Sequence, residues 1–398
     1  MSAAHKPAVR FDGRPAWAEI NLGALVENFR AIRRHVSAPR PASGPRKILA
    51  VVKANAYGLG AVPVSKALAK AGTDWFGVTC TSEGAELREA GIRQPILILT
   101  GFWPGEERRL LEYGLTPAIT RCEQLRLLDR AAARSKRRRG LLGFHLKIDT
   151  GMNRLGISPG DIECFARELA GCRRLRLEGA FTHFASSDVF TTAQTEQQAA
   201  AFCAALKRLK ALGIPPGIVH MANSAAVAAR PETWADMVRP GAMLYGYYQD
   251  FDPPQRRAEV QTSLPLTPVL SLRARLISLR DLAPGQKVGY NARFVATRPT
   301  RVAVIAAGYA DGLRRALGGQ GRVIVRGQFA PLVGLVSMDL AAVDVTGVAG
   351  ASVGDVATIY GADGAASQHV SEVAHSLGTV TSDLLCALGK RVPRFYLP

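Results

Sequence analysis

The sequence predicts an α/β protein with two domains, an N-terminal (β/α)8 TIM-type barrel followed by a C-terminal, mainly β domain. Between Lys47 and Gly246, short β-branched runs alternate with polar, helix-like segments. This alternation indicates a parallel sheet, and eight repeats of it in roughly 200 residues favour a closed barrel over an open sheet. After about residue 256 the sequence changes to runs rich in Val, Ile, Leu and Ala that are broken by Gly and Pro turns, which is typical of a mainly β domain.

The barrel strands are expected at the β-branched runs, and the segments between them carry helix start and stop signals. Residues 82–91, for example, have an acidic start and a closing glycine. The expected strands are 48–53, 75–79, 95–100, 115–120, 143–149, 175–184, 217–223 and 237–246.

The second domain is expected to follow a linker at 250–261. Its predicted elements are strands within 265–279, 300–310, 321–327 and 354–360, a helix near 369–388 and a Pro-bounded C-terminal tail. The predicted division of the chain is an N-terminal tail at 1–14, the barrel at 15–255 and the β domain at 256–398.

Composition and charge argue against several classes of protein. No apolar stretch approaches the ~20 residues that span a bilayer, and the N-terminus lacks the apolar core of a secretory signal, so we expect a cytoplasmic protein that contacts no membrane. The six cysteines have no CxxC spacing, which predicts reduced thiols without a zinc site. The net charge of +19 would fit nucleic acid, but the one dense basic run, 134–139, ends an expected helix, so we expect a solvated helix end and no nucleic-acid partner.

Polar residues gather where the expected barrel strands end, and the chemistry of such barrels lies at the C-terminal ends of their strands. Those ends carry Lys53, the segment 149–154, His183, Asn223 with Ser224, and Arg239 with Gly241.

Lys53 ends an apolar run in the stretch AVVKANAYGLG (50–60). An ammonium group at the end of a buried strand costs free energy unless its charge is paired or suppressed. Suppression makes the lysine an amine nucleophile that forms a Schiff base with a substrate carbonyl or with pyridoxal phosphate. From this stretch alone, a lysine whose head reaches solvent at the strand end is an equally good interpretation.

The fifth expected strand is polar on one face and apolar on the other. Period-two alternation places His145, Lys147 and Asp149 on one face and Phe144, Leu146 and Ile148 on the other. The apolar face should meet the helices, which leaves Lys147 inside the barrel. A buried lysine there needs a partner or a modification.

Seven stretches resemble the signatures of one enzyme family and follow the family's order along the chain. They are AVVKANAYGLG (50–60), LKIDTGMNRLG (146–156), THFASSD (182–188), VRPGAMLYG (238–246), VGYNARF (288–294), GYADG (308–312) and VSMD (336–339). The chain thereby resembles alanine racemase, a fold-type III pyridoxal phosphate enzyme, from 16–29 to 390–398. The resemblance implies a cytoplasmic homodimer that interconverts L-alanine and D-alanine, in biosynthesis of D-alanine for the cell wall or in its breakdown.

The resemblance implies that Lys53 holds pyridoxal phosphate in the barrel and also acts as one of two bases. Tyr290 from the partner subunit would be the other base, because racemisation removes the α-proton from one face and returns it to the other. Positive charge from Arg154 or His183 would favour its phenolate. Arg239 would face the pyridine nitrogen and keep it unprotonated, which should limit side reactions such as transamination. Without the resemblance, an arginine that closes a salt bridge at a strand end is the ordinary interpretation.

The remaining site residues follow from the same resemblance. The cofactor phosphate would lie on Tyr57, Ser224 and the backbone of Gly241 and Ala242, with His183 and Asn223 also in the cofactor site. Substrate would meet Arg154 and, from the partner's β domain, Tyr309, Met338 and Asp339. Lys147 would be carbamylated and orient Arg154, or it would pair as an ammonium with Asp149.

Two positions depart from the family pattern. Lys390 stands where relatives often have a phosphate-contacting tyrosine, and Ser337 stands where many have cysteine. Three other functions stay open: a broad-specificity racemase of serine or basic amino acids, a non-catalytic pyridoxal phosphate carrier, and a barrel metallohydrolase that uses carbamylated Lys147 with His145, His183 and His220. The carrier generally lacks a β domain, and no HxH pair supports the metal, so we expect no metal site.

Overall fold

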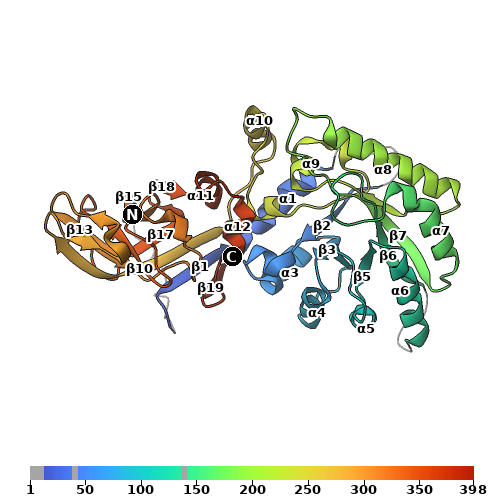
Figure 1. Cartoon of the computed structure of the whole chain (residues 1–398), viewed down its shortest axis with the longest axis horizontal. Coiled ribbons are helices and arrows are strands. Elements are labelled where there is room, and N and C mark those ends of the chain that lie inside the picture. The colour runs from blue at the N-terminus through green and yellow to red at the C-terminus, as the bar shows by residue number, and fades with distance from the viewer. Residues whose placement is uncertain (1–12, 38–43, 136–140) are drawn as a thin grey trace. The chain divides into compact units, whose positions relative to one another are not determined.

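The computed structural model describes residues 13–37, 44–135 and 141–398. The chain divides into two compact units (Figure 1). One unit is Leu22–Pro268, and the other combines the segment that ends at Asn21 with Val269–Pro398. The N-terminal strand therefore belongs to the unit that holds the C-terminal part of the sequence.

The first unit is built on eight parallel strands in the order β8-β7-β6-β5-β4-β3-β2-β9. The strands are β2 (Lys47–Val51), β3 (Trp75–Val78), β4 (Ile96–Ile98), β5 (Thr116–Ile119), β6 (Leu142–Lys147), β7 (Leu175–Phe181), β8 (Ile218–His220) and β9 (Met237–Val238). The Asp236 N–H donates to the Val219 carbonyl (2.9 Å) and the Arg239 N–H to the Ala222 carbonyl (3.0 Å). These bonds join the two end strands, so the sheet is nearly closed and the predicted barrel is confirmed.

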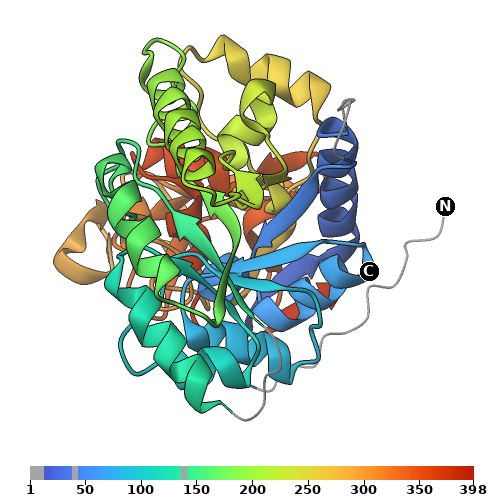
Figure 2. The ribbon, with the colours of Figure 1, turned by 90° about the vertical axis from the view of Figure 1, so that its right-hand side faces the viewer.

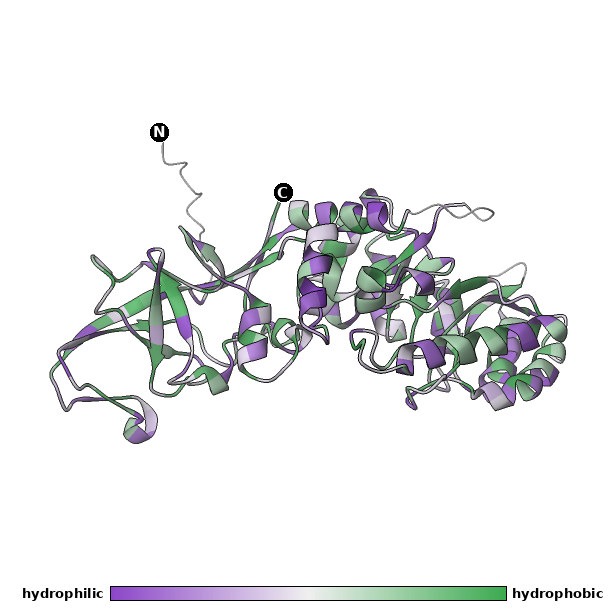
Figure 3. Cartoon of the chain, turned by 90° about the horizontal axis from the view of Figure 1, so that it is seen from above, coloured by the Kyte–Doolittle hydropathy of each residue, from purple (hydrophilic) through white to green (hydrophobic). Residues whose placement is uncertain are grey.

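Helices surround this barrel (Figure 2). They are α1 (Leu22–His35), α3 (Ala61–Lys70), α4 (Thr81–Glu89), α5 (Glu107–Glu112), α6 (Glu123–Arg134), α7 (Ile162–Ala170), α8 (Gln194–Ala211), α9 (Ser224–Ala229) and α10 (Gln255–Ser263). The segment α2 (Lys53–Tyr57) is a left-handed turn, and η1 (Pro159–Asp161), η2 (Pro231–Thr233) and η3 (Ala242–Tyr245) are short 3-10 turns. These helices carry both hydrophilic and hydrophobic residues (Figure 3), as a helix with one buried face requires.

The predicted alternation along β6 is confirmed. Phe144 packs edge-on against Phe165 of α7, with ring centroids 6.2 Å apart, while His145 and Lys147 are buried on the opposite face. The apolar face of β6 therefore meets a helix and the polar face lines the interior of the barrel, where the strand ends form the candidate site.

The second unit is a nine-stranded sheet in the order β18-β17-β14-β15-β16-β13-β10-β1-β19. Its strands are β1 (Ala16–Asn21), β10 (Leu270–Leu282), β13 (Thr300–Ile305), β14 (Arg322–Val325), β15 (Gln328–Val333), β16 (Ala341–Asp344), β17 (Val356–Asp363), β18 (Ala366–Gln368) and β19 (Arg394–Leu397). A separate ribbon pairs β11 (Lys287–Val288) with β12 (Phe294–Val295), and η4 (Tyr290–Ala292) and η5 (Arg315–Leu317) are short turns. β1 pairs with β10 and β19, so both ends of the described chain enter one sheet.

Two sequence predictions need correction, and a third falls mostly outside the described residues. The helix expected near 369–388 is two helices, α11 (Val370–Ser376) and α12 (Thr381–Cys386), because Gly378 between them has a left-handed φ of 63° that no right-handed helix contains. The expected linker is largely helical, since α10 occupies most of it. Most of the basic run 134–139 lies outside the described residues.

None of the six cysteines forms a disulfide in the described structure. Within the described ranges, no helix is both long enough and apolar enough to cross a bilayer.

Candidate active site

Lys53 begins a strained left-handed turn directly after β2. Ala54, Asn55, Ala56 and Tyr57 have φ values of 53°, 55°, 52° and 57°. Each non-glycine residue in this conformation costs about 1–2 kcal/mol, and such strain persists where the surrounding structure holds it, typically at functional sites.

Two side chains hold this turn. Glu83 Oε1 accepts a hydrogen bond from the Ala54 N–H (2.6 Å), and Asn55 Oδ1 accepts one from the Ala61 N–H (2.7 Å). Lys53 itself is half-buried and, in the part of the chain that the structure describes, forms no ion pair or hydrogen bond through its amine. A lysine amine without a carboxylate partner is suited to covalent chemistry.

Tyr57, Ser224 and Gly241 lie together beside that turn. The Gly241 N–H donates to Ser224 Oγ (2.8 Å), and a Cβ at Gly241 would lie 2.5 Å from the Tyr57 hydroxyl. A side chain at position 241 would therefore require the Tyr57 hydroxyl to move. Ala242, which follows Gly241 and begins η3, is buried. The structure therefore brings together the hydroxyl and backbone groups that the sequence predicted as a phosphate site.

Asn223 caps the helix that begins with Ser224. Its Oδ1 accepts hydrogen bonds from the Ala226 N–H (3.1 Å) and from Ser187 Oγ (2.7 Å). These bonds fix the start of α9 and therefore the position of the Ser224 hydroxyl. Asn223 therefore positions Ser224 by holding the start of the helix. Its side-chain oxygen already accepts these two hydrogen bonds.

Arg239 is almost fully buried at the end of β9, with 4% of its surface exposed. Its guanidinium donates to the carbonyls of Thr182 (2.7 Å) and Met221 (2.9 Å) and to His220 Nδ1 (3.1 Å). In the described structure no carboxylate pairs with it, so the ordinary interpretation of a salt bridge at a strand end is wrong. Burial lowers the pKa of Arg239 to about 9, which still leaves the group charged at neutral pH.

A chain of two histidines continues from Arg239 into the barrel. Because Arg239 donates to His220 Nδ1, the His220 proton lies on Nε2, which is 2.8 Å from His145 Nδ1. Burial first, and then the charge of Arg239, lower the pKa of His145 to about 3 and that of His220 well below its usual value. Both rings are therefore neutral. The sequence placed His220 on a strand but gave no sign that it would contact Arg239.

His183 lies on the other side of the same arginine, with its Nδ1 3.4 Å from Arg239 Nη2. Burial, followed by the charges of Arg239 and Lys147, holds the pKa of His183 well below its usual value. Among the described residues, no group of three or more His, Cys, Asp or Glu side chains is arranged to hold a metal ion.

Lys147 is buried, and no acidic side chain among the described residues pairs with its amine. Burial, and after it the charges of Arg154 and Arg239, lower the pKa of this amine to about 8. Burial alone would raise the pKa of Asp149, but its carboxylate accepts N–H groups of residues 151–154, each at 3.0 Å, and these lower it. The expected ammonium pair between Lys147 and Asp149 is not formed in the described structure.

Arg154 is exposed and reaches a cavity at the C-terminal ends of β3, β4 and β5. The cavity has a volume of about 420 Å³ and is lined in part by Thr79, Thr100, Thr120 and Arg154. This cavity lies at the strand ends of the barrel, and it carries a cation at its edge.

The other predicted site residues lie in the second unit. Tyr290 begins η4 beside the β11–β12 ribbon and is 70% exposed. Tyr309 lies next to the Met338–Asp339 segment, because its N–H donates to the Ser337 carbonyl (3.0 Å) and the Ala310 N–H donates to the Met338 carbonyl (3.1 Å). The structure thus brings Tyr309, Met338 and Asp339 together.

The two departures from the family pattern also lie in this unit. The Ser337 hydroxyl is engaged with Leu340, donating to its carbonyl (2.7 Å) and accepting from its N–H (3.1 Å). Lys390 is exposed and precedes Arg391. Whether either residue serves a ligand stays a prediction.

Comparison with known proteins agrees with this geometry. Models of the alanine racemase N-terminal and C-terminal domains match residues 20–249 and 269–396. An alanine racemase of Geobacter sulfurreducens is 40% identical over 97% of this chain and 98% of its own length. The crystal structure of the biosynthetic alanine racemase of Pseudomonas aeruginosa has a TM-score of 0.82 and 36% identity, covering 96% of this chain and 99% of that one.

Two further solved structures hold small molecules. The alanine racemase of Bacillus anthracis with bound L-Ala-P has a TM-score of 0.86 and 31% identity, covering 98% of this chain and 96% of that one. The alanine racemase of Bartonella henselae with covalently bound pyridoxal phosphate has a TM-score of 0.83 and 29% identity, covering 97% of this chain and all (100%) of that one. The chain belongs to the alanine racemase family of enzymes.

Proposed function

We propose that this chain is a pyridoxal phosphate-dependent racemase that interconverts L-alanine and D-alanine by a two-base mechanism. The observation that carries the proposal is the strained turn after β2, which presents an unpaired Lys53 and places the Tyr57 hydroxyl against Ser224 and Gly241. An amine beside a cradle of hydroxyl and backbone groups suits a ligand that has both an aldehyde and a phosphate.

The residues of the barrel fit pyridoxal phosphate. Lys53 would hold it covalently, and Tyr57, Ser224, Gly241 and Ala242 would hold its phosphate, since a side chain at Gly241 would fill the cradle. The Bartonella henselae relative with covalently bound pyridoxal phosphate supports the same cofactor here. When bound, this cofactor supplies an electron sink for the bond between the amino-acid Cα and its hydrogen.

Arg239 would donate a hydrogen bond to the pyridine nitrogen. Its guanidinium keeps its proton at neutral pH, and its present acceptors, two carbonyls and His220, are neutral. A donor that keeps its proton leaves the ring nitrogen as an acceptor. His183 would anchor the ring or Tyr290.

Two bases would exchange the α-proton, one on each face of the substrate. Lys53 Nζ would act on one face, and the hydroxyl of the partner's Tyr290 would act on the other. The exposure of Tyr290 in its own chain, 70%, is consistent with a residue that serves a second copy. We therefore propose a homodimer with composite active sites.

The substrate would be a small amino acid whose carboxylate meets Arg154 and the Met338–Asp339 segment beside Tyr309. The relative with bound L-Ala-P supports an alanine-sized ligand. Lys147 would be carbamylated and orient Arg154, because its lowered pKa of about 8 enriches the neutral amine that adds carbon dioxide. We further propose a cytoplasmic location and a role in supplying D-alanine for the cell wall.

The test is the formation of D-alanine from L-alanine by purified protein reconstituted with pyridoxal phosphate. Lys53→Ala is the inactive control, and a panel of L-serine, L-lysine and L-arginine measures breadth. Turnover of alanine well above that of the panel supports the proposal. Equal turnover would identify a broad-specificity racemase, and bound cofactor without turnover of any amino acid would identify a carrier.

A further inference from the structure

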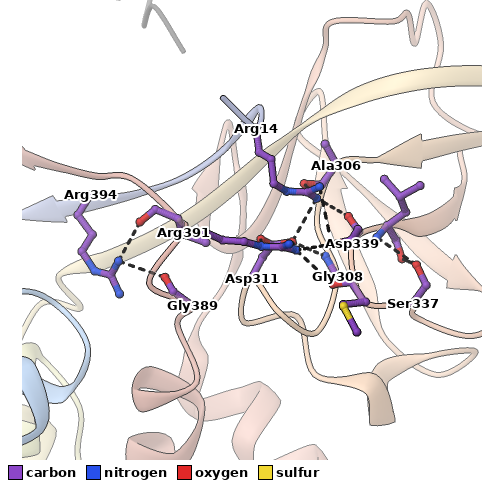
Figure 4. Close-up of polar contacts among 12 residues, drawn as sticks. Arg14, Ala306, Gly308, Asp311, Ser337, Asp339, Gly389, Arg391 and Arg394 are labelled. Atoms are coloured by element: carbon purple, nitrogen blue, oxygen red, sulfur yellow. Dashed lines mark hydrogen bonds and ion pairs between the residues drawn. The ribbon is translucent and has the colours of Figure 1, made fainter. Parts of the chain in front are cut away.

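The second unit contains a cluster of four charges that joins both ends of the chain to two loops (Figure 4). We call Arg14, Asp311, Asp339 and Arg391 the charged cluster. The Asp311 carboxylate is 1% exposed and accepts from Arg391 Nε (2.7 Å), Arg391 Nη2 (3.0 Å) and Arg14 Nη2 (3.3 Å). Two carboxylates and two guanidinium groups make the charged cluster neutral.

The same arginines hold the Met338–Asp339 segment. Arg391 Nη2 lies 2.7 Å from Asp339 Oδ1 and donates weakly to the Met338 carbonyl (3.4 Å), while Arg14 Nη2 donates to the Asp339 carbonyl (2.5 Å). Gly308 packs against the same segment, since a Cβ there would lie 2.3 Å from the Met338 carbonyl oxygen. The segment is therefore held by three other parts of the chain.

Two adjacent N–H groups of this segment have no acceptor. Across the described ranges, neither the Met338 N–H nor the Asp339 N–H donates a hydrogen bond, although Ser337 and Leu340 on either side do. Backbone N–H groups without an acceptor are available as donors to an anion. A carboxylate that approached them would also meet the negative charge of Asp339, which repels it unless a nearby cation compensates that charge.

We propose that Arg391 is a positioning residue for the substrate, because it compensates the charge of Asp339 and fixes the Met338–Asp339 N–H groups so that they bind the amino-acid carboxylate. This inference rests on the proposed function, which brings an amino acid to this segment. It assigns Arg391 an effect on substrate binding, and therefore on KM, with a smaller effect on kcat.

Steady-state racemisation by the holoenzyme tests the inference. Arg391→Gln should raise KM for alanine by up to about fivefold, the size of one charge contact at a half-exposed position. Arg391→Lys keeps the charge but loses the paired hydrogen bonds to Asp311, so it should raise KM less than Arg391→Gln does. The matched control is Arg298→Gln, which breaks an exposed ion pair with Asp344 (3.1 Å) in the same unit and should leave both constants unchanged.

The double variant Arg391→Gln/Asp339→Asn separates charge compensation from folding. Removing the uncompensated charge should bring KM back toward the original value, although the hydrogen bonds of Arg391 to Asp311 are still missing. An unchanged KM in Arg391→Gln, or a raised KM that the second substitution does not reverse, would overturn the inference. Protein with no racemase activity before any substitution would instead overturn the proposed function.

Discussion

Arg239 has surroundings unlike those of most buried arginines. Buried guanidinium groups usually pair with carboxylates, because an isolated charge away from water is costly. Here the acceptors are two carbonyls and the neutral ring of His220. Among the described residues the positive charge is therefore uncompensated, and it contributes to the lowered pKa values of His145, His183 and His220. This charge is available to a group bound beside it.

Replacing Arg239 with an acid should change which reaction the cofactor supports. In Arg239→Glu, we expect the ratio of transamination to racemisation to rise, because a carboxylic acid shares its proton with the pyridine nitrogen and strengthens the electron sink. Product analysis by chiral chromatography and keto-acid detection measures the ratio. Arg239→Gln, which adds no acid, is the control. An equal ratio of transamination to racemisation in the unsubstituted protein, Arg239→Gln and Arg239→Glu would refute the role of Arg239.

Gly241 tests the proposed phosphate cradle. Gly241→Ala places a Cβ 2.5 Å from the Tyr57 hydroxyl, and overpacking of this kind costs about 1–3 kcal/mol, so we expect at least about fivefold weaker binding of pyridoxal phosphate. Fluorescence titration of the apoprotein measures the affinity. Gly347→Ala, at a position with open space around the Cβ, should bind normally. Equal affinity in both variants would place the phosphate elsewhere.

Lys147 should take up carbon dioxide in a pH-dependent way. Carbamylation needs the neutral amine, and the pKa of about 8 means that the neutral fraction rises as pH rises through 8. We expect a carbamate carbon signal in NMR spectra of protein equilibrated with ¹³C-bicarbonate, stronger at pH 8.5 than at pH 7 in this window. Lys147→Ala should remove the signal, and Lys66→Ala, at an exposed site, should not.

At the scale of elements, the left-handed turn after β2 is the most unusual backbone feature of the candidate site. Four consecutive non-glycine residues adopt a conformation that the sequence ANAY does not favour, and the pattern of apolar residues gives no sign of it. Tertiary contacts from Glu83 and Asn55 stabilise it. The resemblance to a cofactor-lysine signature predicted a site at this segment, while its backbone geometry came only from the structure.

Glycine at position 54 should stabilise the protein. Ala54 has a φ of 53°, where glycine carries no steric penalty, so Ala54→Gly should raise the free energy of unfolding by up to about 1 kcal/mol. Ala67→Gly, in the right-handed helix α3, should lower it by about 1 kcal/mol. Urea unfolding measures both. A loss of stability in Ala54→Gly equal to that in Ala67→Gly would contradict the left-handed turn.

The sequence predicted the barrel strands well because each is a β-branched run followed by helix signals, and these signals are local. The sequence did not predict the features that depend on residues far apart along the chain. Nothing local indicates that Gly378 would end one helix and separate it from the next. The hydrogen bonds of His220 with Arg239, and of Arg391 with Asp311, join segments that are remote in sequence, and no periodicity encodes them.

At the scale of the whole molecule, the predicted site residues are divided between two units. Lys53, Tyr57, His183 and Arg239 lie in the unit Leu22–Pro268, whereas Tyr290, Tyr309, Met338 and Asp339 lie in the unit that contains Val269–Pro398. A single active site that uses both groups must draw them from one chain or from two. The proposed homodimer takes them from two copies.

Mixing two inactive variants tests this composite site most directly. Lys53→Ala and Tyr290→Phe homodimers should each be nearly inactive, because each lacks one of the two bases at every site. After subunit exchange, a heterodimer has one site with both substitutions and one site with native Lys53 and native Tyr290. An equal mixture should therefore regain about a quarter of the original racemase activity. If differentially tagged heterodimers form and no activity returns, Tyr290 does not act across the dimer and the two-base assignment is wrong.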